Sequence, residues 1–445
     1  MMQKAKASVT ICLSLCMLMF FTLCIVLAEG TRVYYLRVKA MQAMELAEFS
    51  VLSEYQKELF EDYGVFFLDL DYEQGTEQKA ILEGRAESYL RKNIEEAETV
   101  TLQTANFRRA TDGSGSAFFL QAVEQVKIES GYKVLEKVFD GMGNVKPDSV
   151  NLEELLKASE DKASGLLSGL KEAAENKLLN ISLPDISFPN VNILRESVFG
   201  NAESLSDKSM ALSERLLHRQ LTKGAGEEVR ISFAQMQLFY LYLFQNFGYF
   251  GSENEEIPRQ ALEYQLEYII AGKNSDAKNI ENIMWRIFTL RAGGNYLFYH
   301  QDAGQLAKAE TKAMALVGFT GNVVLINLVR ELFLIAQAME DGIQQTKTVF
   351  AGGKVPLYEN GVFDGVFIGY EQYLYLFLNA AGKEEKIYRS MDVIELEVRK
   401  SSGYENFRLD HCVDFFEVEW TYCYDGLIRS QRYKHTINRN MNYEM

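Results

Sequence analysis

The chain has 445 residues, of which 47% are hydrophobic, and a formal net charge of −16. This length is enough for about two or three domains, and the apolar content excludes broad intrinsic disorder. The acidic balance argues against a nucleic-acid partner, because phosphate binding requires clustered lysine and arginine side chains. We interpret the acidity as a solvated surface that keeps the folded protein soluble.

The distribution of the five cysteines argues against a disulfide framework. Cys12, Cys16 and Cys24 lie in an apolar run near the N-terminus, which leaves Cys412 and Cys423 for the rest of the chain. If these two lie on one continuous strand, about 36 Å separates them, which is far beyond the reach of a disulfide. We therefore predict that Cys412 and Cys423 are reduced.

Residues 9–28 form an apolar run of 20 residues without a charged side chain. As a helix this run spans about 30 Å, which matches the hydrocarbon core of a bilayer. Lys4 and Lys6 precede the run, and Glu29 follows it at once. By the positive-inside rule, residues 1–8 form a short cytoplasmic tail and the bulk of the chain is extracellular.

Two alternatives to an uncleaved anchor remain open. In a cleaved signal peptide, Val26 and Ala28 would be the small residues before a cut at Glu29. The apolar run is longer than the roughly 7–15 residues of a typical signal core and leads into a helical pattern, which favours the anchor. In a lipoprotein, Cys24 would carry the lipid, but bulky Leu23 stands where a small residue is expected.

An amphipathic helix is predicted to continue the membrane segment. Between residues 9 and 63 there is no proline, and the one glycine is Gly30. Apolar residues recur at the steps of three and four that define one helix face, namely Met44, Ala47, Val51, Tyr55 and Leu59. We predict one helix of about 80 Å that ends at Gly64. Its apolar face needs a partner, either the globular part of the same chain or a neighbouring copy.

The next part of the chain is predicted to alternate between strands and helices. Short apolar runs at residues 65–68 and 100–107 predict strands, and the charged segment 76–98 predicts a helix. Residues 112–115 predict a turn or a helix entry. The following segments are predicted as helices over 117–180, an extended proline-containing linker over 181–192, and helices again from about Ser204.

Two later apolar segments have the length of a membrane span. Residues 233–250 are rich in aromatic residues but contain four glutamine and asparagine side chains. Residues 313–329 contain Asn322 and Asn327 and run directly into Arg330. We therefore interpret both segments as buried core helices rather than membrane spans.

Strict alternation predicts a β-hairpin near the C-terminus. Phe416, Val418, Trp420, Tyr422 and Tyr424 alternate with more polar residues, which is the period of a half-buried strand. Asp425-Gly426 predicts a two-residue hairpin turn, and residues 427–436 would then form the return strand.

The strongest candidate for chemistry is Asp69-Leu70-Asp71, which follows an apolar strand. Haloacid-dehalogenase-type phosphatases begin in this way, with the first aspartate as nucleophile and Mg²⁺ as counter-charge. Glu73 stands where that pattern has threonine or valine, and the chain has no Gly-Asp dipeptide for the later metal motif. We therefore interpret these carboxylates as solvated groups at a strand end.

Phosphate-loop and metal-ligand patterns are incomplete. Gly352-Gly353-Lys354 matches part of a phosphate loop, but Thr348 and Val355 replace required residues. The four histidines occur singly, without metal-ligand spacing; they are His218, His300, His411 and His435. The sequence therefore predicts no catalytic residue, no cofactor and no metal site.

Several segments carry a resemblance to known proteins. They are residues 7–10, 29–33, 51–55, 58–69, 266–273 and 352–357. In these segments the chain resembles the TadE/TadG-like pseudopilins of tight-adherence (Tad) pilus systems, and more closely an uncharacterised clostridial family of Tad-pilus-associated membrane proteins. The resemblance implies an envelope protein that works with a pilus or type II-like secretion machine. The prepilin-peptidase pattern is missing, so we do not expect the main fibre subunit.

The combined prediction is an α+β protein in which one N-terminal transmembrane helix continues into a long amphipathic helix. A mostly helical ectodomain and a C-terminal antiparallel β-hairpin region follow. The predicted divisions are a cytoplasmic tail (1–8), the transmembrane helix (9–28), a stalk helix with the first strands (29–110), a helical region with the proline-containing linker (111–192), a helical core (193–350) and a β-rich region (351–445).

The predicted function is a non-catalytic structural or assembly role at the cell membrane. The expected partners are the lipid bilayer and other pilus or secretion envelope proteins, with self-association through the N-terminal helix and no nucleic acid. The alternative is a surface-anchored binding module, an adhesin or a sensor. An exported hydrolase is a third, less favoured hypothesis.

Overall fold

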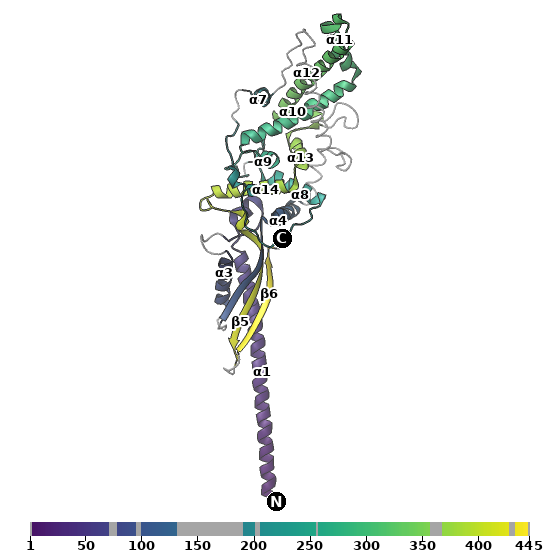
Figure 1. Cartoon of the computed structure of the whole chain (residues 1–445). Coiled ribbons are helices and arrows are strands. Elements are labelled where there is room, and N and C mark those ends of the chain that lie inside the picture. The colour runs from purple at the N-terminus through teal and green to yellow at the C-terminus, as the bar shows by residue number, and fades with distance from the viewer. Residues whose placement is uncertain are drawn as a thin grey trace. The chain divides into compact units, whose positions relative to one another are not determined.

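A computed structural model describes residues 2–70, 78–94, 99–130, 190–200, 205–254, 257–356, 367–426 and 432–443 (Figure 1). The fold is α+β, as predicted, with a long N-terminal helix and antiparallel strands near the C-terminus. Contacts divide the chain into a first unit (1–121, 221–229 and 406–445) and a second unit (122–220 and 230–405). The two ends of the chain thus belong to one unit, whereas the sequence suggested consecutive segments.

Helix α1 (Met2–Leu52) is uninterrupted through the apolar run and beyond it. The prediction that it continues to residue 63 is wrong. The amide of Gln56 donates to the carbonyl of Phe67 at 2.8 Å, and the Tyr443 hydroxyl donates to the Leu52 carbonyl at 2.8 Å. These tertiary hydrogen bonds replace the next helical turn. A short helix, α2 (Lys57–Tyr63), follows and ends at Gly64 with φ +64°, as predicted.

The first unit contains a four-stranded antiparallel sheet with β5 (Cys412–Asp425) at its centre. Strand β2 (Thr99–Arg109) pairs with one edge of β5 and confirms the strand predicted at residues 100–107. On the other edge lie β1 (Leu68–Asp69) and β6 (Arg432–Asn442). The strand predicted at residues 65–68 is thereby reduced to the pair of residues in β1.

One face of β5 packs against α1 and α3 (Gln78–Asn93), which confirms the helix predicted at residues 76–98. The alternating side chains from Phe416 to Tyr424 are all buried in this core, as a period of two requires. The two helices contribute small and branched residues to the same core: Leu36, Ala40, Ala43, Met44, Ala47 and Val51 from α1, and Leu82, Ala86 and Leu90 from α3.

The hairpin between β5 and β6 differs from the predicted two-residue turn. Asp425 pairs with Arg432, so six residues separate the paired positions. Rings stack across the strands in this register, with Tyr424 and Tyr433 centroids 5.5 Å apart. We attribute the register to these aromatic pairs, which would be offset by a tight Asp-Gly turn.

The second unit is mostly helical. Its helices are α4 (Asp112–Ser130, which begins in the first unit), α7 (Val191–Phe199), α8 (Phe233–Asn246), α9 (Gln265–Ala271), α10 (Asp276–Gln301), α11 (Ala303–Val317), α12 (Val323–Phe350), α13 (Tyr370–Ala380) and α14 (Lys383–Lys400). Strands β3 (Val355–Pro356) and β4 (Phe367–Ile368) pair with each other. The region predicted as β-rich, residues 351–445, therefore includes two helices, α13 and α14.

Two predictions about the middle of the chain need correction. Residues 131–180 of the predicted helical region, and 181–189 of the predicted linker, lie outside the described residues. The linker's last two residues are helical, because the Asn190 side chain accepts the Ile193 amide at 2.9 Å and begins α7. Helices do not resume at Ser204, since residues 205–232 hold only short 3-10 turns before α8.

The two apolar segments of the second unit behave differently. Helix α8 is largely buried, which confirms a core helix. The segment 313–329 is not one helix, because it breaks at Gly321, whose φ is +64°. Its exposed side chains include Phe319 and Val324. The prediction of a buried core helix is therefore wrong for the residues around the break.

Candidate functional site

The first half of α1 has the properties of a membrane span. Among the helices that the structure describes, α1 alone is long and apolar enough to cross a bilayer. Its most apolar window is not buried against the rest of the protein. Ser14 and Thr22 donate their hydroxyl protons to carbonyls one turn earlier, at 2.8 Å each, so these polar groups are satisfied within the helix.

The second half of α1 has two opposite apolar faces. The inner face, centred on Ala43 and Ala47, is fully buried in the core of the first unit. The predicted apolar face therefore docks on the same chain, which confirms one of the two alternatives. The outer face lies about half a turn away around the helix and carries Tyr34, Tyr35, Val38, Met41, Leu46 and Phe49, all exposed. We call these six residues the outer stripe.

Polar contacts attach α1 to the rest of its unit. The guanidinium of Arg32 donates to the Asp425 carbonyl at 3.0 Å, at the far end of the hairpin. Burial raises the pKa of the Glu48 carboxyl above its ordinary value, and a neighbouring arginine opposes that shift. The helix therefore connects the apolar segment to the sheet without a hinge between them.

The phosphatase-like motif does not assemble into a site in the part of the chain that is described. Asp69 lies on β1 opposite Cys412, while Asp71 and Glu73 lie outside the described residues. Gly352-Gly353-Lys354 forms the turn between α12 and β3, with Gly352 at φ +80° and Lys354 exposed. Both observations agree with the interpretation of these residues as strand-end and loop positions.

The histidines remain dispersed in the structure. His218 and His300 are exposed, and His411 and His435 lie on or beside β5 and β6. No group of three or more His, Cys, Asp or Glu side chains within the described ranges is placed to hold a metal ion.

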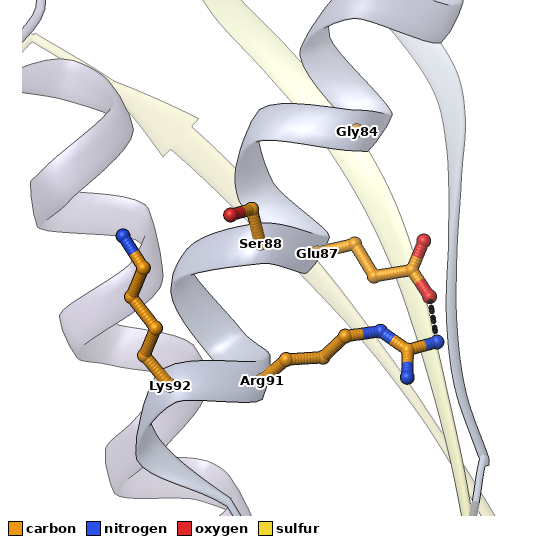
Figure 2. Close-up of a pocket in the computed structure, with 5 residues that line it drawn as sticks. All are labelled: Gly84, Glu87, Ser88, Arg91 and Lys92. Carbon is orange, nitrogen blue, oxygen red and sulfur yellow. Dashed lines mark hydrogen bonds and ion pairs between the residues drawn. The ribbon is translucent and has the colours of Figure 1, made fainter.

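A shallow pocket lies on the outer side of α3 (Figure 2). Its volume is about 400 Å³, and it is lined by Gly84, Glu87, Ser88, Arg91 and Lys92. Figure 2 shows Glu87 and Arg91 joined to each other, at 2.7 Å, on one side of the helix. Because all five residues come from a single helix and the pocket is wide open, it offers few convergent groups to a ligand.

The second unit contains buried carboxylates that the sequence analysis did not find. Glu267 on α9 accepts the Phe250 amide at 2.8 Å and the Tyr370 hydroxyl at 2.7 Å. Burial raises the pKa of Glu267 to about 7. Asp392 on α14 accepts the Leu216 amide at 2.7 Å, and burial raises its pKa to about 6.

Glu397 on α14 is a third example among the buried carboxylates of this unit. Its carboxylate accepts the backbone amides of Gln260 and Ala261, at 2.9 and 3.0 Å, and the side-chain amide of Gln265 at 2.9 Å. Each of these three carboxylates thus holds an irregular segment against a helix. In the sequence, the signal that could have identified such a residue is a charged side chain inside an apolar run. Residues 393–398 are an example, because two glutamates there interrupt branched apolar residues.

The architecture defines an α+β protein with one candidate membrane-spanning helix joined directly to a sheet. The chain belongs to a family of unknown function, DUF5702, whose model matches residues 159–362 and 364–424, more than half of the chain. The match covers Glu267, Asp392 and Glu397 and does not include α1. No curated protein and no solved structure matches the chain.

Proposed function

We propose that the protein is a single-pass membrane protein with residues 1–8 in the cytoplasm and the bulk of the chain outside the cell, where it has a non-catalytic structural role. One observation carries this proposal. Helix α1 is continuous from its exposed apolar half to the half that forms the core of the first unit. A rigid connection of this kind transmits position and force from the membrane to a folded body, which a mobile tether does not do.

The outer stripe supports a role in an assembly. Exposed apolar side chains scattered singly are ordinary, but six gathered on one helix face, with the exposed Gln42 and Glu45 among them, form a largely apolar surface. The stripe begins within two turns of the apolar run, so a neighbouring helix could follow both. We propose self-association through α1 as the contact that covers the stripe. Within the apolar run, Ser14 and Thr22 are small enough to allow close helix approach.

The resemblance to Tad-associated pseudopilins supports the type of assembly. We propose that the protein works with the envelope components of a pilus or type II-like secretion machine, and that these components are further partners. A secretion ATPase and its membrane platform encoded beside the gene would agree with this proposal. Specific binding of an external ligand by intact cells, lost on deletion of the gene, would favour the surface-anchored binding module instead.

Fractionation with external protease tests the topology. We expect the full-length chain in the membrane fraction, and we expect protease added to intact cells to digest everything beyond about residue 29. Protein that resists external protease until the cells are lysed would contradict the orientation. A released, soluble form whose first residue is Glu29 would contradict the anchor.

Site-specific photocrosslinking tests the self-association. We expect a benzophenone side chain at Phe49, 72% exposed on the outer stripe, to give a crosslinked dimer in membranes. The matched control is the same probe at Phe233, 57% exposed at the start of α8, which should give no dimer. Equal yields at both positions, or a heterologous product alone at Phe49, would contradict self-association through α1.

A further inference from the structure

The turn between α11 and α12 forms an apolar tip in the second unit (Figure 1). From residue 313 to residue 329 the chain has no charged side chain. Four of these residues fill the space between the two helices, namely Ala313, Val317, Leu325 and Val329. Five large apolar residues point outward and are exposed: Met314, Leu316, Phe319, Val323 and Val324. We call these five residues the tip.

The exposed residues surround the hairpin instead of forming one face. Met314 and Leu316 are two positions apart, so their side chains point to nearly opposite sides of α11, about 200° apart. Phe319 lies in the turn itself and is 81% exposed. A groove on a protein covers one face of a hairpin, whereas a fluid apolar phase can cover all sides at once. The distribution therefore favours lipid as the occupant.

The polar groups of the turn bond to one another. The Thr320 hydroxyl donates to the Val317 carbonyl at 2.7 Å and accepts the Asn322 amide at 3.2 Å. The Asn322 side chain accepts the amides of Val324 and Leu325 at 3.0 and 3.3 Å. A turn that satisfies its backbone in this way can enter an apolar medium at a much lower cost than an open loop.

The charges on the two helices begin at a similar distance from the turn. Lys312 is five residues before the end of α11, about 8 Å along the helix, and Arg330 is seven residues after the start of α12, about 10 Å. Both are basic, although Arg330 also pairs with Glu331 at 3.0 Å. Interfacial helices bury their apolar face about 5–10 Å deep, and basic side chains at that level attract anionic headgroups.

We propose that the tip inserts into the interface of an anionic lipid bilayer without crossing it. Neither α11 nor α12 is long and apolar enough to span a membrane, so the contact is shallow and is separate from the anchor in α1. The tip would give the second unit its own attachment to lipid.

Fluorescence of a labelled full-length protein tests this proposal. The five native cysteines are replaced by alanine or serine, and an environment-sensitive dye is placed at Phe319→Cys. The protein is held in nanodiscs of neutral lipid, and vesicles containing phosphatidylglycerol are then added. In a second arm the protein is reconstituted directly into such vesicles. We expect a blue shift and quenching by lipid-borne shallow quenchers in at least one arm, and no change for the dye at Glu310→Cys, below the level of Lys312.

Substitution provides the second readout. Phe319→Ser, Val323→Ser and Val324→Ser together should lower the partition of the nanodisc-held protein onto anionic vesicles on the order of a hundredfold, if each side chain contributes about 1 kcal/mol. These positions are exposed, so the melting temperature should not fall. Water-like emission at Phe319→Cys in both arms would overturn the proposal. A blue shift that rises with protein concentration in the absence of added vesicles would also overturn it and would identify a second copy as the occupant.

Discussion

The guanidinium Nε of Arg439 in β6 lies 3.1 Å from the carboxylate of Glu48 in α1. The same guanidinium approaches Glu45, one turn earlier, at 3.4 Å. An ion pair therefore links β6, the last strand of the chain, to α1, the first helix. It lies at a position where burial disfavours the charged form of the Glu48 carboxyl. This pair joins α1 to the sheet in addition to their common apolar core.

Arg439→Gln should destabilise the first unit. Glu48 would remain largely buried without its counter-charge, and an unpaired charge of this kind costs about 1–3 kcal/mol. Thermal unfolding of the full-length protein in detergent at pH 7 measures the loss. Adding Glu48→Gln should recover most of it, because the buried charge is then removed.

The control for this pair is Lys434→Gln, on the same strand and exposed. It should change stability by less than about 0.5 kcal/mol. If Arg439→Gln and Lys434→Gln unfold at the same temperature, the pair does not stabilise the attachment of α1.

Gly224→Ala should destabilise the loop that closes over Asp112. The Asp112 carboxylate accepts the amides of Arg109 and Gly224 at 2.9 and 2.8 Å. A Cβ at Gly224 would lie 2.3 Å from that carboxylate and 2.7 Å from the Phe107 carbonyl, so backbone must move. We expect a loss of about 1–3 kcal/mol, as for other overpacked sites, measured by denaturant unfolding.

Gly84→Ala in α3 is the matched control, because no atom lies within 4 Å of its added Cβ. Alanine is favoured over glycine inside a helix by about 0.5–1 kcal/mol, so this variant should be slightly more stable than the wild type. A Gly224→Ala protein as stable as the wild type would show that the loop does not need a glycine.

Some elements could be predicted from local sequence patterns alone, without knowing which distant segments they contact. The alternation from Phe416 to Tyr424 predicts a half-buried strand, and β5 buries all five of the alternating apolar side chains. The charge-free run before Glu29 predicts an exposed apolar helix, and Gly64 predicts a helix end. In each case the pattern that predicts the element is local, although β5 obtains its pairing and its burial from segments that are distant in the sequence.

Features decided by distant partners could not be predicted in this way. Helix α1 ends at Leu52 because Tyr443 and Phe67 supply hydrogen bonds there, and neither is near Leu52 in the sequence. The hairpin register follows ring stacking between Tyr424 and Tyr433 rather than the local turn signal. Of the candidate site, the inner face of α1 was visible as a heptad-like pattern, but the outer stripe required knowledge of what the inner face covers.

The pKa of Glu267 predicts a pH-dependent stability of the second unit. Burial raises this pKa to about 7 from an ordinary value of 4.5. The folded state therefore holds its proton more tightly than the unfolded state does. The stabilisation is complete below pH 4.5 and is lost as the pH rises through about 7, by about 3 kcal/mol in total.

Glu267→Gln mimics the neutral acid and should remove this component. The variant should be more stable than the wild type at pH 8 and similar to it at pH 4, as measured by thermal unfolding across that range. The exposed Glu310→Gln should retain the wild-type profile. A Glu267→Gln protein less stable than the wild type at pH 8 would indicate that the Phe250 and Tyr370 hydrogen bonds require the charged carboxylate.

The cysteines of β5 give the final prediction. Cys412 is fully buried and Cys423 is partly exposed, and neither forms a disulfide. They lie 11 residues apart on one strand, about 36 Å, so no motion short of unfolding the sheet can join them.

In a variant in which Cys12, Cys16 and Cys24 are alanine, a maleimide should label one thiol in the folded protein and two after denaturation. Because Cys423 lies in register with Lys434 near the turn end of the hairpin and is partly exposed, Cys423→Ala should abolish the folded-state labelling, whereas Cys412→Ala should leave it unchanged. A mobility difference between reduced and non-reduced protein would show that a bond forms after all and that β5 does not persist as one strand.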